Sequence, residues 1–216
     1  MNQEETCVKK CKAILTALAV IFCAAMLAGC GTSYNSTTFV LNKDRSARQY
    51  IIEDADADTT ITELKAYVTA SIRDYLAGSD DELIKLEKCD INDGKVDIEL
   101  LYATCADYAA YNDVVCFEGT LQEAEEAGFD LTGTYLTPEG GSISLDQITA
   151  GEGQIRVLIM NEVTSVDLPG TLLAYSDNAV LGENGILTTI PDTDESLPEE
   201  FRTINYNNSY FIYSVK

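Results

Sequence analysis

The chain has 216 residues, with 36 acidic and 14 basic side chains and a formal net charge of −22 at neutral pH. This excess of negative charge disfavours nucleic-acid binding, which depends on contacts of Lys and Arg with phosphate. The chain has no histidine, which excludes Ser-His-Asp and Cys-His catalysis and every zinc site that uses imidazole.

The first thirty residues have the three parts of a secretory signal. Lys9, Lys10 and Lys12 form a basic stretch, and residues 13–27 carry no charge and are almost all apolar. Leu27-Ala28-Gly29-Cys30 then closes the segment and resembles the lipobox of bacterial lipoproteins. This resemblance implies transfer of a diacylglyceryl group to the Cys30 thiol and signal cleavage between Gly29 and Cys30.

The alternative interpretation of this segment is an uncleaved transmembrane helix. Residues 13–29 would span about 25 Å as a helix, whereas a bilayer core of about 30 Å usually needs about 20 residues. We therefore favour a signal peptide over 1–29, a lipidated tether over 30–36 and a single domain over 37–216. The expected location is the extracytoplasmic face of the cell membrane, where two or three acyl chains anchor a protein stably.

Cleavage would leave a strongly acidic mature chain. Removing residues 1–29 takes away three lysines and two glutamates, which leaves 11 basic and 34 acidic side chains and a formal charge of −23. The simplest role of this charge is to keep an exported protein soluble and apart from its neighbours.

Three cysteines remain in the expected domain: Cys89, Cys105 and Cys116. Their odd number leaves at least one thiol free unless it pairs between chains. Cys105 and Cys116 could pair, but no spacing resembles a metal motif, and we favour small buried apolar side chains for all three.

The domain is expected to begin with a β-hairpin. Residues 37–41 and 50–52 are largely apolar and flank the polar stretch 42–46, a pattern typical of two strands and a turn.

A helix is expected from Thr60 to Ala77. Apolar residues recur there at spacings of three and four, which predicts one apolar stripe. Thr60 and Glu63 form a capping box at its start, and Gly78 is a natural stop. The stripe consists of Ile61, Leu64, Val68, Ile72 and Tyr75.

The Asp93-Gly94 pair is the clearest local signal in the chain. It separates residues 83–92 from 95–103 and predicts a hairpin with a two-residue type I′ turn. Pairing Asn92 with Lys95 places Cys89 opposite Ile98 on a mostly apolar face. The same register predicts the pairs Ile91–Val96, Glu87–Leu100, Asp90–Asp97, Lys88–Glu99 and Leu86–Leu101.

Two short helices are expected next. Thr104 is a cap for a helix over 105–112, and Thr120 is part of a capping box for a helix over 121–127. A brief strand is expected between them, over 114–117.

The last third is expected to be mostly strand. Residues 154–161 are almost continuously apolar, which is typical of a central strand buried on both faces, and 191–200 read as an acidic loop. Further strands are expected over 163–168, 171–176, 178–181, 186–190 and 210–215.

Several stretches of the chain resemble a group of uncharacterised clostridial-type lipoproteins. The resemblance covers most of residues 37–181. It implies an exported, lipid-anchored domain and no particular activity. The stretches that carry it are Ile51–Asp54 leading into Thr60–Leu76, Asp93–Val96, Tyr102–Asn112, Phe117–Ala124, Pro169–Asn178 and a terminal strand like Tyr210–Val215.

One acidic motif suggests calcium but departs from the calcium-loop pattern. Asp54, Asp56 and Asp58 have the D-x-D-x-D spacing, yet Thr59 replaces the required glycine and Lys65 stands where the bidentate Glu belongs. We favour acids that precede a helix N-terminus, where the helix dipole stabilises negative charge.

Two further patterns are weak. Gly151-Glu152-Gly153 begins a phosphate-loop pattern, but Arg156 occupies the third glycine position and a strand follows rather than a helix. Tyr102, Tyr108 and Tyr111 could stack on a sugar ring, although packing against the sheet is the simpler role.

The sequence thus predicts an α+β fold: an antiparallel-rich sheet with one long amphipathic helix and two short helices packed on it. It predicts no catalytic residue, metal or cofactor. We expect a lipid-anchored surface binding or interaction module that holds an envelope protein, a peptide or a wall component. The alternative is a carboxylate-dependent enzyme acting on glycans, which would need two facing acids in one cleft.

Overall fold

The computed structural model describes residues 34–77, 81–190, 192–193, 204–205 and 207–216. The expected signal peptide, Cys30 and the first part of the tether lie outside these residues. So do Gly78, expected to stop the first helix, and most of the acidic loop 191–200. Among the described residues, no helix is long and apolar enough to span a bilayer.

The described chain contains three α-helices, a 3-10 turn and many short strands. The helices are α2 (Ile61–Tyr75), α3 (Cys105–Asn112) and α4 (Leu121–Glu126), and the 3-10 turn is η1 (Leu145–Gln147). The strands of the first half are β1 (Thr38–Leu41), β2 (Ala47–Asp54), β3 (Ile84–Asn92), β4 (Lys95–Tyr102), β5 (Cys116–Gly119), β6 (Thr134–Leu136) and β7 (Ser142–Ser144). Those of the second half are β8 (Gln154–Met160), β9 (Ser165–Asp167), β10 (Thr171–Tyr175), β11 (Ala179–Leu181), β12 (Leu187–Thr189), β13 (Asp192–Thr193), β14 (Ile204–Asn205) and β15 (Ser209–Val215).

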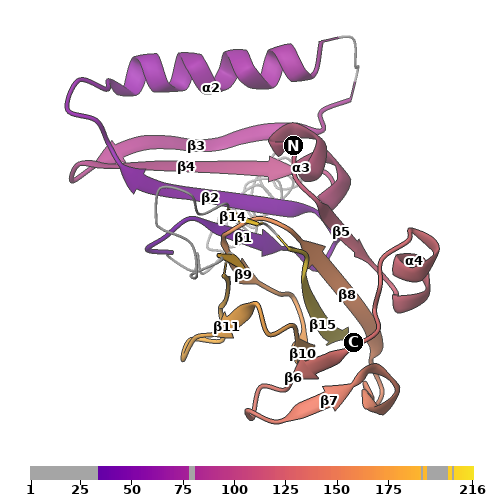
Figure 1. The fold of residues 1–216 in the computed structure, drawn as a ribbon. Coiled ribbons are helices and arrows are strands. Elements are labelled where there is room, and N and C mark those ends of the chain that lie inside the picture. Colours follow the sequence, from indigo (N-terminus) through magenta and orange to yellow (C-terminus); the bar gives the residue numbers. More distant parts are fainter. Residues whose placement is uncertain (1–33, 78–80, 191, 194–203, 206) are drawn as a thin grey trace, which may run out of the picture. The chain divides into compact units, whose positions relative to one another are not determined.

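The strands form two large sheets and one small one. The seven-stranded sheet has the order β11-β12-β9-β1-β2-β4-β3, and the six-stranded sheet has the order β5-β8-β15-β10-β6-β7 (Figure 1). Every pairing in these sheets is antiparallel except that of β1 with β9. The α+β class and its antiparallel character are therefore confirmed, whereas the prediction of a single sheet was wrong.

Strand β8 explains why there are two sheets and two cores. Leu158 and Met160 lie in the larger apolar cluster, which also contains Phe39 of β1. Val157 and Ile159 point to the opposite face and lie in a second cluster. All four side chains are fully buried, which confirms the expected central strand. A strand that is apolar on both faces needs a layer on each side.

The Asp93-Gly94 turn is confirmed, but the register predicted for the far end of its hairpin was wrong. Both residues have positive φ, 50° and 74°, as a type I′ turn requires. The register matches the expectation from Asn92 back to Lys88. A β-bulge at Glu87 then places Leu86 opposite Leu100 instead of Leu101. The bulge turns Leu86 toward the apolar face and leaves Glu87 without a paired residue on β4.

The predicted helix caps are present, although the capping box expected at Thr60 and Glu63 is only half formed: Glu63 Oε2 accepts from the Thr60 hydroxyl rather than from its amide. Thr60 accepts a hydrogen bond from the Glu63 amide, and Thr104 accepts one from the Asp107 amide. Thr120 and Glu123 make both hydrogen bonds of a capping box. α2 lies along β3 (Figure 1).

The structure adds strands that the sequence did not indicate. β6 and β7 form a small hairpin at the edge of the six-stranded sheet, and β13 pairs with β14. The expected strand 163–168 is shortened to β9, and the expected strand 114–117 is shifted to β5. Three-residue strands are too short to show a sequence period.

Candidate functional site

A buried carboxylate lies where β5, β8, β15 and the β1–β2 turn meet. The Glu118 side chain is only 3% exposed. Its Oε2 accepts from Arg45 Nε at 2.6 Å, and its Oε1 accepts from Arg156 Nε and from the Tyr213 hydroxyl, the latter at 2.8 Å. Arg156 and Tyr213 are paired across β8 and β15, so the sheet register sets two of these donors side by side.

These donors keep Glu118 ionised. Burial by itself raises the pKa of this carboxyl, but hydrogen bonds from Arg156, Arg45 and Tyr213 outweigh it, and the net pKa is lowered. Both oxygens already accept hydrogen bonds, and the carboxyl is ionised rather than protonated. Its arrangement is that of a structural ion pair rather than of a general acid.

Arg156 keeps one unused donor. Its side chain is 9% exposed, and its Nη2 is buried without a hydrogen-bond partner, the one such atom among the described side chains. An unsatisfied buried donor is costly, so this nitrogen is suited to a water molecule or to a polar ligand atom.

A second carboxyl, the partly buried Glu162, follows β8. Burial raises its pKa, and a hydrogen bond from the Tyr108 hydroxyl partly offsets the increase. Behind it, the Tyr102 hydroxyl donates to Gln49 Oε1 at 2.8 Å, and Gln49 Nε2 donates to the Tyr108 hydroxyl at 3.5 Å. Asn112 Nδ2 donates to the Tyr102 hydroxyl at 3.3 Å.

The tyrosines expected as packing residues or as a sugar platform are core residues. Tyr102 and Tyr108 have no exposed surface, and their rings pack edge to face at 5.0 Å. Tyr111 is partly buried, packs on Tyr102 and exchanges a hydrogen bond of 2.9 Å with Ser71 of α2.

Glu118 and Glu162 have pKa values shifted in opposite directions, as an acid–base pair would require. Glu118 lines a pocket of about 490 Å³ together with Arg45, Cys105 and Cys116, which we call the thiol pocket. Glu162 does not line this pocket. The thiol pocket therefore does not bring these two side chains together in the way that a carboxylate-dependent enzyme needs.

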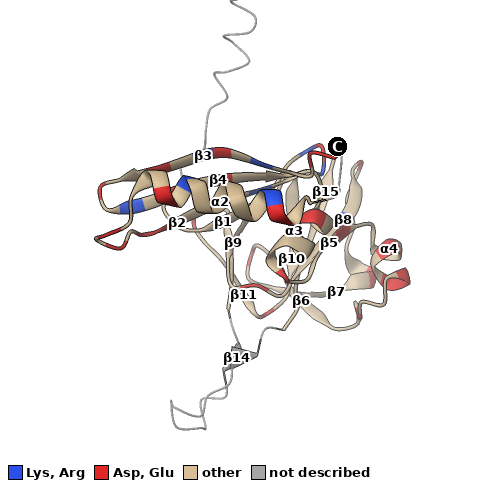
Figure 2. Ribbon diagram, turned by 90° about the horizontal axis from the view of Figure 1, so that it is seen from above, with Lys and Arg blue, Asp and Glu red and all other residues tan. Residues whose placement is uncertain are grey.

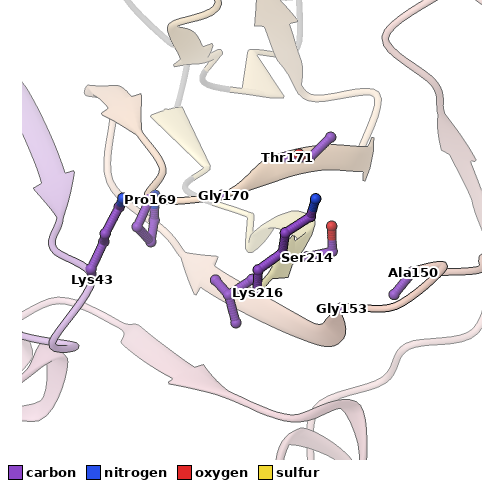
Figure 3. Close-up of a pocket in the computed structure, with 9 residues that line it drawn as sticks. Lys43, Ala150, Gly153, Pro169, Gly170, Thr171, Ser214 and Lys216 are labelled. Atoms are coloured by element: carbon purple, nitrogen blue, oxygen red, sulfur yellow. The ribbon is translucent and has the colours of Figure 1, made fainter.

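A different pocket gathers positive charge. It has a volume of about 440 Å³, and we call it the basic pocket. Figure 3 shows two lysines at this pocket. Lys43 lies in the β1–β2 turn, and Lys216 is the residue that follows β15. The nine lining residues are Lys43, Ala150, Gly153, Pro169, Gly170, Thr171, Ser214, Val215 and Lys216.

The composition of the basic pocket is opposite to that of the chain. Acids outnumber bases by more than two to one in the sequence, yet none of the nine lining residues is acidic and two are lysines. Acidic residues are spread instead over α2, α4 and the β3–β4 hairpin (Figure 2). The pocket can therefore receive an anionic group.

Close backbone contact forms part of the basic pocket. A Cβ on Gly170 would lie 2.1 Å from the Ser214 carbonyl oxygen, so only glycine allows β10 and β15 to approach here. Gly153, from the discarded phosphate-loop pattern, also lines this pocket and precedes a strand as expected.

The acids upstream of α2 do not gather around a common point. Asp54 Oδ1 accepts from Lys95 Nζ at 3.2 Å, and Asp56 and Asp58 line a shallow depression with Tyr67. Within the described residues, no group of three or more His, Cys, Asp or Glu side chains is placed to hold a metal ion.

The expected site residues Gly29 and Cys30 lie outside the described residues. The three domain cysteines are free and buried, as the packing interpretation predicted. Sequence reasoning missed Glu118 and Lys43. The one signal for Glu118 was Arg156, a charged residue within an otherwise apolar strand.

Comparison with known proteins gave no match to any family model, curated protein or solved structure.

We expect Glu118→Gln to destabilise the fold by about 3–5 kcal/mol at neutral pH, because it leaves the buried Arg156 without its counter-charge. The folded pKa of Glu118 lies below the reference value of 4.5, so its stabilisation is complete above that pH and is lost as pH falls through the lowered pKa. Urea unfolding at neutral pH and near pH 3 measures both effects.

Glu82→Gln is the matched control, because Glu82 pairs with Lys85 on the surface. We expect no change in its unfolding midpoint. Equal stability of the two variants would show that the Glu118 cluster contributes nothing.

We expect the opposite pH dependence for Glu162→Gln. The folded pKa of Glu162 is raised above 4.5, so ionisation carries no penalty below that pH and an increasing one as pH rises through the raised value. The neutral variant should therefore gain stability relative to the parent as pH rises from about 4.5 toward neutral pH. A constant difference across this range, measured by chemical unfolding, would contradict the assignment.

Proposed function

We propose that the chain is a lipid-anchored binding module at the extracytoplasmic face of a bacterial membrane. It would hold an anionic group of an envelope protein, peptide or wall component. The basic pocket carries this proposal, because none of its lining residues has an acidic side chain and two are lysines, in a strongly acidic chain. The lipobox at Leu27-Ala28-Gly29-Cys30 supports the location, as does the resemblance to clostridial-type lipoproteins.

The start of the described chain supports a short tether. The Tyr34 hydroxyl donates to Asp167 Oδ2 at 2.5 Å, and its ring packs on Tyr50 with centroids 4.7 Å apart. Only four residue steps separate Cys30 from Tyr34, a reach of at most roughly 14 Å. Lipid on Cys30 would therefore hold the seven-stranded sheet close to the membrane surface.

We also propose that α2 is the long amphipathic helix suggested by the sequence. Val68 and Ile72 are buried against the sheet, whereas Ile61 and Tyr75 at its ends are 39% and 38% exposed. Tyr67 on the opposite face is 74% exposed.

The anchor is tested by Cys30→Ser. We expect loss of metabolic palmitate label and loss of sedimentation with the membrane, because a hydroxyl does not form the thioether. Cys23→Ser, in the apolar segment, should keep both. Unchanged label in Cys30→Ser would overturn the lipid-anchor proposal.

The basic pocket is tested by the double variant Lys43→Ala, Lys216→Ala. Using the detergent-solubilised full chain at about 0.15 M salt, calorimetric titration with inorganic phosphate should show affinity reduced by about tenfold, because two charge-assisted contacts are lost.

The control is the double variant Lys85→Ala, Lys95→Ala, which makes the same change of net charge at two surface ion pairs. It should bind phosphate with about the affinity of the parent chain, because neither lysine lines the basic pocket. Equal losses in both double variants would show that net charge, rather than the basic pocket, sets the affinity.

A further inference from the structure

Two of the three domain cysteines lie together although eleven positions separate them. Cys105 is the first residue of α3, and Cys116 is the first residue of β5. Both line the thiol pocket, and the Cys105 side chain is close enough to raise the pKa of the Cys116 thiol. From this placement we propose that Cys105 and Cys116 form a reversible intramolecular disulfide by thiol–disulfide exchange.

Local structure holds the two ends of this segment in place. α3 ends at Asp113, whose left-handed conformation (φ 55°) reverses the chain, and the Val114 amide donates to the Ala109 carbonyl at 3.1 Å. The Val115 amide then donates to Asn161 Oδ1 at 2.7 Å, which fixes the start of β5 beside β8. The start of β5, and with it Cys116, is therefore held in place by ordered backbone.

The thiol pocket gives a reagent a route to the pair. Cys105 and Cys116 are 5% and 7% exposed, but they form part of the wall of a pocket of about 490 Å³. Burial, and next the hydrogen bond with Cys105, raises the pKa of the Cys116 thiol. The raised pKa lowers the thiolate fraction of Cys116, whereas the position of both side chains in the pocket wall gives a small disulfide access to them.

Cys89 provides an internal contrast. It is buried on the β3–β4 hairpin opposite Ile98, and it does not line the thiol pocket. Burial raises the pKa of its thiol as well. Its environment is that of a packed apolar side chain, so we expect it to stay reduced.

The oxidant is a small-molecule disulfide, RSSR, and the exchange has two steps. One cysteine loses its proton and attacks RSSR, which forms a mixed disulfide and releases one thiolate. The other cysteine loses its proton and attacks the protein sulfur of the mixed disulfide, which forms the Cys105–Cys116 bond and releases the second thiolate. The two released thiolates take up the two protons, so the pair is oxidised by two electrons and RSSR is reduced to two thiols.

The test uses oxidised and reduced glutathione with the detergent-solubilised full chain. After acid quenching and alkylation with N-ethylmaleimide, trypsin releases Val96–Arg156, which contains Cys105, Cys116 and no other cysteine. Cys89 leaves in the separate peptide Cys89–Lys95. Mass spectrometry then reads the pair independently of the signal-segment thiols.

We expect Val96–Arg156 to lose two hydrogens and to carry no alkyl group in excess oxidised glutathione, while Cys89 is alkylated. In the folded chain, half-oxidation should need at least about tenfold less oxidant than in concentrated urea, because folding holds the thiols together. Cys89→Ser should behave like the parent, and Cys116→Ser should give only a glutathione adduct or an alkylated Cys105.

Double alkylation of Val96–Arg156 at every glutathione ratio would overturn the proposal. So would equal oxidant requirements in the folded and urea-unfolded chains. The parent chain alone decides both outcomes, and neither depends on where the protein is located in the cell.

Discussion

The burial of β8 on both faces is the constraint on which the structure depends. Leu158 and Met160 join the larger core, and Val157 and Ile159 join the smaller one, so each face of the strand requires its own layer. Arg156 lies on the same face of β8 as Leu158, and its side chain is almost fully buried. A buried guanidinium without a partner would cost several kcal/mol. Glu118 on the neighbouring strand and Tyr213 on the other side offset this cost, and they fix the edge where the thiol pocket forms.

Features set by neighbouring residues could be predicted from the sequence, whereas features set across the sheet could not. Three local features were predicted: the caps at Thr104 and Thr120 and the Asp93-Gly94 turn. Each depends only on residues that are close together in the sequence. The bulge at Glu87 depends on which residue of β4 lies opposite, so a regular register failed there. Strands such as β6 exist because a neighbour offers an edge, and their own sequence shows no period.

The candidate site was hidden for the same reason. Glu118 lies 73 positions from Arg45, 38 from Arg156 and 95 from Tyr213, so no local pattern contains the cluster. Arg156 was the available clue, since a charged residue inside an apolar strand needs a buried partner. With 36 acids in the chain, however, composition alone cannot identify which acid that is. Lys43 and Lys216 are likewise far apart in sequence and meet only through the β1–β2 turn and the end of β15.

The net charge and the basic pocket act on a ligand at different distances. A charge of −22 opposes the approach of anions. Screening, however, limits the electrostatic interaction of each exposed carboxylate to a distance of about 8 Å at physiological ionic strength. At the pocket wall itself the lysines decide, because none of the lining residues has an acidic side chain. A polyanion would meet this opposing charge along its whole length, whereas the pocket wall could contact only a small part of it. A ligand with one anionic group on an otherwise neutral or cationic body satisfies both conditions, which is the charge distribution we expect of the molecule that the basic pocket holds.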